Sequence, residues 1–283
     1  MALTSIDVWS VRTFDAGLMA HLERETELIQ QYYQTDNQIF LSHDLGRGPS
    51  RSILRPSNRY ASNFHAVQEA IGKEMEQRQI RAFHYSRLTD DEVTLLERDG
   101  IHLSTPATLK HRLDNIVSAG GLTRDVADQL YAQSPFHSDQ LEARRGKFWM
   151  ASHPIAVDDG GVEPLMKHWG GEVASMWIRR EVLAAPLASL GKPRIIEVAV
   201  PMTATKHCHF AGPAVVATFA RSRGSITPKQ SFDLYAIEPL TPDAVLAVHT
   251  EGDASYVEMG RTYPDGFIDV GPGYWKELTG EED

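Results

Sequence analysis

Strand-like and helical patterns both occur in this chain, but they do not alternate regularly. Runs rich in β-branched and aromatic residues predict strands at residues 80–87, 147–152, 194–201, 214–219 and 232–237, with shorter pieces at 243–248 and 256–259. Amphipathic periodicity predicts helices at residues 63–78, 90–100, 108–132 and 172–184. A doubly wound parallel sheet would need β-α-β-α order, so the pattern predicts an α+β fold.

Composition limits the classes of protein that the chain can belong to. The formal net charge of −10 argues against a surface that binds nucleic acid everywhere, although it leaves room for a local basic groove. A single cysteine, Cys208, excludes an intrachain disulfide and fits a reducing compartment. No apolar run reaches the roughly 18 residues of a membrane span, and the first residues lack the apolar core of a secretory signal. We therefore expect a soluble cytoplasmic protein.

The 283 residues divide into three expected parts. We expect an N-terminal helical extension or cap at 1–79, one domain at 80–260 and a loosely held tail at 261–283. Residues 41–63 are rich in Gly, Pro, Ser and Asn, which predicts a loop or linker. Four arginines give this segment a local positive bias that could hold phosphate: Arg47, Arg51, Arg55 and Arg59.

Several common signatures are missing from the sequence. It contains no GxGxxG, GxxxxGK[ST], HExxH, CxxC or GxSxG. His207 and His209 are spaced to share a strand face, but no second cluster supplies the further ligands that a zinc or copper site needs. We expect no metal site.

The strand around residue 84 carries the most informative polar residues. Alternation places His84 and Ser86 on one face and Tyr85 on the other. A polar face on a strand that leads into a turn can hold a ligand hydroxyl, although a single strand histidine is more often structural. An acidic helix follows the strand and ends at Gly100.

This arrangement, His-Tyr-Ser on a strand, then a short helix and then Gly-Ile, resembles the opening of the NAD-dependent ADP-ribosyltransferase superfamily, in its bacterial toxin-like branch. The FHYxRLT and WGGE segments look like those of uncharacterised bacterial proteins. The resemblance covers residues 80–248 and implies a split mixed or antiparallel β-sheet core with flanking helices. It also implies that His84 holds the adenosine-side ribose of NAD and that Ser86 helps to hold the nicotinamide half.

A second segment, SFDLYAIEPLTP, is similar to the strand that carries the catalytic carboxylate in this superfamily. It places Asp233 at the carboxylate position, where the family usually has Glu. The shorter acid leaves open an inactive domain, a shifted register or another acid, with Glu238 and Glu172 as substitutes. Without the resemblance, Asp233 would be an edge-strand charge that discourages aggregation.

Other NAD-binding residues follow from the same resemblance. Phe148 or Trp149 would stack on the nicotinamide ring, and alternation allows only one of them on the pocket face. Arg87 could meet a phosphate. Tyr85 is a further candidate for the cofactor site. Apart from the resemblance, Gly170 and Gly171 permit positive φ and a close approach by a ligand, or they only end one helix and start the next. Glu172, next to them, is a further catalytic candidate.

The implied function is transfer of ADP-ribose from NAD, used as a substrate, to a macromolecule. The acceptor is either nucleic acid or protein, since the net charge and the arginines of 47–59 point in different directions. A toxin-like or phage-defence enzyme would also need a neutralising antitoxin-type partner. Three alternatives remain: a catalytically inactive nucleotide- or partner-binding module, a hydrolase using Glu172 with His168 or His84, and a metal-dependent enzyme.

Overall fold

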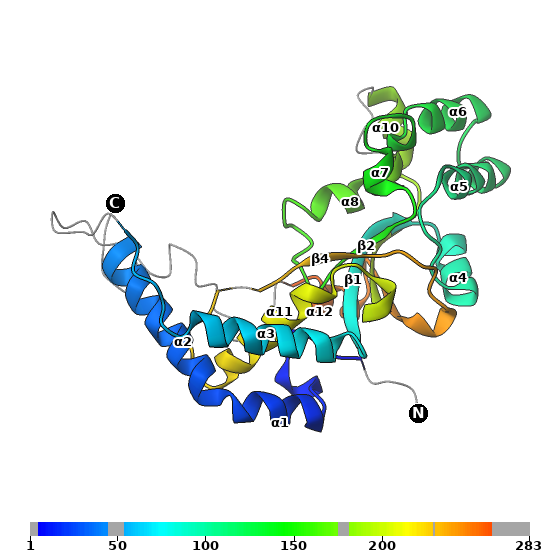
Figure 1. Ribbon diagram of the computed structural model, residues 1–283. Helices are drawn as coiled ribbons and strands as arrows, with labels where there is room; N and C mark the ends of the chain where they lie inside the picture. The colour runs from blue at the N-terminus through cyan, green and yellow to red at the C-terminus, as the bar shows by residue number, and fades with distance from the viewer. Residues whose placement is uncertain (1–4, 45–53, 175–180, 229, 262–283) are drawn as a thin grey trace. The chain divides into compact units, whose positions relative to one another are not determined.

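The computed structural model describes residues 5–44, 54–174, 181–228 and 230–261, and the chain forms two compact units (Figure 1). The described residues of unit 1 lie within 1–79 and 207–232. Unit 2 consists of residues 80–206 and 233–264. The chain is a mixed α and β protein with one open five-stranded antiparallel sheet, which agrees with the α+β expectation at this level.

Unit 1 is helical. Its elements are η1 (Val11–Thr13), α1 (Ala16–Arg24), α2 (Thr26–Ile39), the π-helical η2 (Phe40–Asp44), α3 (Ala61–Met75) and α11 (Cys208–Ser222). Apolar side chains from four of these helices form its core: Leu18 and Leu22, Ile29, Phe64 and Ile71, and Val215 and Phe219. α11 packs against α3 and α2, although it lies far from them in sequence.

A glycine allows the close approach of α11 to α3. A Cβ atom at Gly212 would lie 2.3 Å from the backbone oxygen of Gln68 and 2.8 Å from the backbone nitrogen of Gly72. Only a residue without a side chain fits at that distance. The backbones of the two helices therefore pack directly on each other at this point.

Unit 2 is built on the sheet. Its strands are β1 (Gln79–Leu88), β2 (Phe148–Ala151), β3 (Lys192–Pro201), β4 (Asp233–Ala236) and β5 (Val245–Thr250), in the order β4-β2-β1-β3-β5. β2 runs antiparallel to both β1 and β4, and β3 runs antiparallel to β5. The central strand is therefore β1, which carries the His-Tyr-Ser segment.

The register of three neighbouring strands fixes which side chains share a face. Phe83 on β1 lies opposite Ala151 on β2, and Ala151 lies opposite Asp233 on β4. Cross-strand partners point to the same side of a sheet, and the next residue along each strand points to the other side. Asp233 therefore shares a face with Phe83, whereas His84 belongs to the opposite face.

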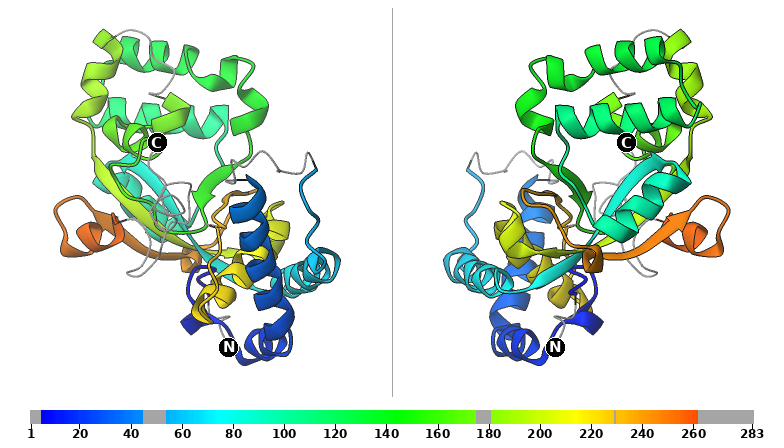
Figure 2. Two further views of the ribbon diagram at one scale, coloured as in Figure 1. Left: turned by 90° about the vertical axis from the view of Figure 1, so that its left-hand side faces the viewer. Right: turned by 90° about the vertical axis from the view of Figure 1, so that its right-hand side faces the viewer.

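Helices occupy the connections of unit 2. They are α4 (Asp90–Asp99), α5 (Pro106–Ser118), α6 (Arg124–Ala132), α7 (Leu141–Arg144), α8 (Glu163–Lys167), α9 (Gly171–Ala174), α10 (Glu181–Ala188) and α12 (Ala254–Met259), with short 3₁₀ turns η3 (Pro135–His137), η4 (Met202–Ala204) and η5 (Pro242–Ala244). Figure 2 shows α5, α6 and α10 close together. Their apolar faces enclose Trp169 in a second core with Leu109, Leu130 and Leu187.

α4 begins and ends as its sequence predicts. Thr89 and Glu92 form a capping box, in which the Thr89 side chain accepts from the Glu92 backbone and the Glu92 side chain accepts from the Thr89 backbone. Gly100 ends the helix with φ of 82°. A Cβ there would lie 2.1 Å from the backbone oxygen of Leu240, so the glycine also permits close contact with that segment.

Three sequence-based expectations need correction. Residues 214–219 are not a strand but part of α11, and residues 256–259 belong to helix α12. α11 is buried on nearly every side, so its apolar run has no helical periodicity to distinguish it from a buried strand. Residues 207–232 were expected in the domain 80–260 but belong to unit 1, together with residues 1–79.

Some predicted features lie outside the described residues: the tail from 262 onward, and Arg47 and Arg51 of the arginine-rich loop. The two described arginines of that loop have partners within unit 1, since Arg55 lies 3.5 Å from Asp36 and Arg59 donates to the Tyr60 hydroxyl. Within the described ranges, no helix combines the length and the apolar character required to cross a membrane.

Candidate functional site

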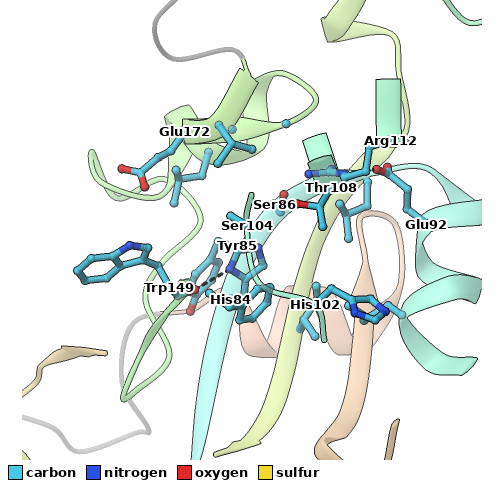
Figure 3. Close-up of a pocket in the computed structure, with 18 of the residues that line it drawn as sticks. His84, Tyr85, Ser86, Glu92, His102, Ser104, Thr108, Arg112, Trp149 and Glu172 are labelled. Atoms are coloured by element: carbon cyan, nitrogen blue, oxygen red, sulfur yellow. Dashed lines mark hydrogen bonds and ion pairs between the residues drawn. The ribbon is translucent and has the colours of Figure 1, made fainter. Parts of the chain in front are cut away.

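A pocket with a volume of about 1010 Å³ lies within unit 2. β1, β2, α4 and α5 line it, together with Gly170 and the start of helix α9. Figure 3 shows His84 and Ser86 in its middle, Glu172 and Trp149 on one side, and Arg112 and Glu92 on the other. Most of the predicted site residues line it: His84, Tyr85, Ser86, Phe148, Trp149, Gly170, Gly171, Glu172 and Asp233.

His84 is held in one orientation by the neighbouring strand. Its Nδ1 lies 2.8 Å from the carbonyl oxygen of Trp149. Burial lowers the pKa of His84 to about 4; the bond to Trp149 raises the pKa, and the nearby Arg112 charge lowers it further. The ring is therefore neutral near pH 7, with its hydrogen on Nδ1. Nε2 makes no hydrogen bond to any described residue, so its lone pair is available to a ligand.

Ser86 and Phe148 complete the face on which His84 lies. The His84 and Phe148 rings are 4.3 Å apart between centroids, with an interplanar angle of 33°. Ser86 is buried and lines the pocket, and its hydroxyl makes no hydrogen bond within the described residues. An acceptor nitrogen, a hydroxyl and an aromatic ring therefore stand next to one another on a single face.

The intervening residues point to the other face. The centroids of the Trp149 and Tyr235 rings are 4.6 Å apart, and Nε1 of Trp149 donates a hydrogen bond to the carbonyl oxygen of Ala143. The Tyr85 hydroxyl accepts a hydrogen bond from the backbone nitrogen of Ile155. Of the two candidate stacking residues, Phe148 is thus the one beside His84, as alternation requires.

Arg87 does not line the pocket. Its Nε donates to the carbonyl oxygen of Leu190 at 2.8 Å, and its Nη1 lies 3.5 Å from the carbonyl oxygen of Met166. The guanidinium therefore joins β1 to two neighbouring segments of unit 2. Its expected role as a phosphate ligand has no geometric support, because alternation sends it to the face away from Ser86.

Asp233 contributes to the wall of the pocket, but not on the His84 face. The register aligns it with Ala151 and Phe83, one residue out of phase with His84. The predicted pair, a histidine and this aspartate gripping one ligand from the same face, therefore conflicts with the strand alternation. The alternative acid Glu238 is exposed and does not line the pocket.

Glu172, another of the predicted acids, lines the pocket next to the two glycines. Its Oε1 lies 2.9 Å from Nη2 of Arg144, which also lines the pocket. The glycines bring it there, because Gly170 and Gly171 both have positive φ, at 83° and 45°. A Cβ on Gly170 would lie 2.4 Å from the Cβ of Ala174. His168, the other proposed member of a hydrolase pair, does not line the pocket.

A polar cluster on the opposite side was not predicted as functional. Glu92 accepts hydrogen bonds from Arg112 Nε at 2.7 Å and from Trp169 Nε1 at 2.8 Å. Burial raises the pKa of Glu92, but the Arg112 charge and these hydrogen bonds outweigh it, so the pKa is lowered overall. The capping-box spacing of Thr89 and Glu92 was readable in the sequence, whereas the contact with α5 depends on tertiary structure.

Among the described residues, no group of three or more His, Cys, Asp or Glu side chains is placed to hold a metal ion. The ring centroids of His207 and His209 lie 6.4 Å apart near the start of α11.

Comparisons with protein-family models, curated proteins and solved structures found no match to this chain. The functional argument therefore starts from the residues of the pocket.

Proposed function

We propose that the pocket binds NAD and that the protein is an NAD-dependent ADP-ribosyltransferase whose sheet is of the split type found in that superfamily. One observation carries the proposal. His84, Ser86 and Phe148 share one face of the sheet and line one cavity. The volume of about 1010 Å³ lies at the upper end of the usual range for small-molecule sites, so it suits a dinucleotide.

The chemistry of the three side chains suits the parts of NAD. The neutral His84 ring accepts a hydrogen bond at Nε2, and a ribose hydroxyl is a donor of that kind. The Ser86 hydroxyl can both donate and accept, as the nicotinamide amide requires. Phe148 offers an aromatic surface beside His84 for the nicotinamide ring.

In the proposed reaction, the bond between C1′ of ribose and the nicotinamide nitrogen breaks, and its electron pair leaves with nicotinamide. A nucleophilic atom of the acceptor then forms a bond to C1′ and loses its proton to a base or to water. A carboxylate near C1′ would stabilise the positive charge that develops on the sugar. We assign this role to Glu172, because the register turns Asp233 away from the His84 face.

Calorimetric titration with NAD, followed by an assay of nicotinamide release, tests the proposal. We expect the wild type to bind NAD and to release nicotinamide. His84→Ala and Ser86→Ala should each weaken binding about tenfold, a change worth about 1.4 kcal/mol. The control His65→Ala removes an exposed histidine of unit 1 and should bind as the wild type does. Wild-type protein that binds no NAD would overturn the proposal.

The position of Asp233 favours a second candidate function, a nucleotide-binding module without catalysis. Asp233 replaces the family's usual Glu and is out of phase with His84. Such a protein would bind NAD with the same dependence on His84 but would release no nicotinamide. The two assays above therefore separate the enzyme from the binding module.

A further inference from the structure

Arg112 stands out in the pocket because its guanidinium is held in one orientation, although only some of its N–H groups have a hydrogen-bond acceptor. It lies over the ring of the fully buried Trp169, with its Cζ 4.6 Å from the ring centroid. Its Nε donates to Glu92. Its Nη2 is buried and has no hydrogen-bond acceptor within the described parts of the chain. An unsatisfied charged donor of this kind costs free energy unless a ligand supplies the acceptor.

The bonding of Glu92 explains why Arg112 is left incomplete. One carboxylate oxygen, Oε1, accepts from Arg112 Nε. The other oxygen, Oε2, accepts from Trp169 Nε1 and from the backbone nitrogen and the hydroxyl of Thr89. The paired bonds that usually join a carboxylate to a guanidinium therefore do not form. Glu92 fixes the orientation of Arg112 but leaves hydrogen-bond donors for another oxyanion.

Of the two terminal nitrogens of Arg112, Nη2 is buried, whereas Nη1 also makes no hydrogen bond within the described residues and is the donor open to the pocket. Arg112 and Thr108 lie one turn apart on α5 and both line the cavity, and Figure 3 shows them beside Ser86. The Arg112 side chain keeps 29% of its surface exposed. The described lining has six carboxylates and three arginines, so its overall charge does not attract anions. Any anion selectivity would have to come from a specific guanidinium.

We propose that Arg112 forms an oxyanion subsite of the pocket, which takes a phosphate group of the bound ligand. For the identity of that ligand the inference rests on the proposed function, in which the group is the pyrophosphate of NAD. The subsite itself follows from the stacked, half-paired guanidinium and applies to any nucleotide with a phosphate at this position. Ligands that lack the phosphate lose this contact and keep the others.

Isothermal titration with ADP, adenosine and inorganic pyrophosphate tests the subsite without any turnover. We expect the wild type to bind ADP at least tenfold more tightly than adenosine. Arg112→Gln should abolish this preference and leave the affinity for adenosine unchanged, which also shows that the pocket is intact. Arg112→Lys, which keeps the charge but not the paired donors, should retain part of the preference. If pyrophosphate bound but neither ADP nor adenosine did, the site would hold free anions and not nucleotides, and the inference would be overturned.

Lys110→Gln provides the matched control. It removes the same charge from the same helix, but Lys110 does not line the pocket, so the preference for ADP should persist. Equal binding of ADP and adenosine by the wild type, no binding of either, or an unchanged preference in Arg112→Gln would overturn the inference. An Arg112-dependent preference for ADP without nicotinamide release would uphold the subsite and refute the proposed catalysis. If the wild type released nicotinamide but Arg112→Gln kept the preference for ADP, the proposed catalysis would be upheld and the Arg112 subsite refuted.

Discussion

The Nδ1 nitrogen of His84 and the carbonyl oxygen of Trp149 are 2.8 Å apart, and this contact fixes the proton on His84. A carbonyl oxygen only accepts, so Nδ1 must be the protonated nitrogen of a neutral ring. The same bond joins β1 to β2 beside the Phe83–Ala151 pair. It therefore helps to connect two strands and also leaves Nε2 as an acceptor for a ligand.

The depressed pKa of His84 predicts how stability depends on pH. The pKa is about 4 in the folded protein and has a reference value of 6.5. As the pH falls below 6.5, the unfolded state takes up a proton that the folded state does not bind, so the free energy of unfolding decreases. The limiting slope is about 1.4 kcal/mol per pH unit, and well above pH 6.5, where the unfolded-state histidine is also neutral, His84 contributes no pH dependence. Urea denaturation at pH 7.5, 6.5, 5.5 and 5 would measure it.

The control for this measurement is His84→Asn, which removes the titrating group. The wild type should lose more stability between pH 6.5 and pH 5 than the variant does. Carboxyl groups with lowered pKa values, such as Asp15 at about 2, contribute equally to both proteins and so cancel in the comparison. Identical pH profiles of the two proteins would show that His84 titrates normally in the folded state.

The strands of unit 2 were largely predictable because their sequences combine β-branched residues with local alternation. β2 and β4 fall within the predicted segments, and β1 and β3 include theirs and extend them by one or two residues at an end. α11 was not predictable as a helix, because Val215 and Val216 favour strands locally and full burial removes the polar stripe of an ordinary helix. Its place in unit 1 depends on contacts with α3, which no local pattern encodes.

The site was predictable only in part, for a related reason. Alternation along one strand correctly separated His84 and Ser86 from Tyr85, since it needs only local geometry. The relation of His84 to Asp233 depends on the register between three strands, which the sequence does not state. Arg112 was missed because its partners, Glu92 and Trp169, lie 20 and 57 residues away.

The faces of the sheet predict different consequences for two acid substitutions. Asp233→Asn should change the rate of nicotinamide release by no more than about twofold, since its side chain is out of phase with His84. Glu172→Gln should lower the rate about 100-fold, as expected when one electrostatic contact to the transition state is lost. NAD affinity and the melting temperature, measured in parallel, would separate this effect from a loss of folding. The opposite ranking of the two variants would return the catalytic role to Asp233.

Glu92→Gln should destabilise the protein by about 2 kcal/mol, because Arg112 then lacks its carboxylate partner and Gln cannot accept as strongly from Trp169. Asp91→Asn is the matched control. Asp91 lies in the same first turn of α4 and is exposed, and its carboxylate makes no hydrogen bond within the described residues. It should change stability by less than about 0.5 kcal/mol. Urea denaturation would compare the two, and equal effects would mean that Glu92 acts only through the helix dipole.

Two glycines of unit 1 test the packing of α11 on α3. Gly212→Ala places a Cβ 2.3 Å from the Gln68 backbone oxygen, so the helices must separate, at a cost of about 2 kcal/mol or more. Gly72→Ala, by contrast, adds a Cβ inside helix α3 that would meet no atom within 4 Å beyond the backbone of its own helix, and should stabilise the protein by about 0.5 kcal/mol. The two substitutions add the same methyl group, so a difference of opposite sign in the free energy of unfolding can only come from its surroundings. If Gly212→Ala were neutral, the close contact between the two helix backbones would be wrong.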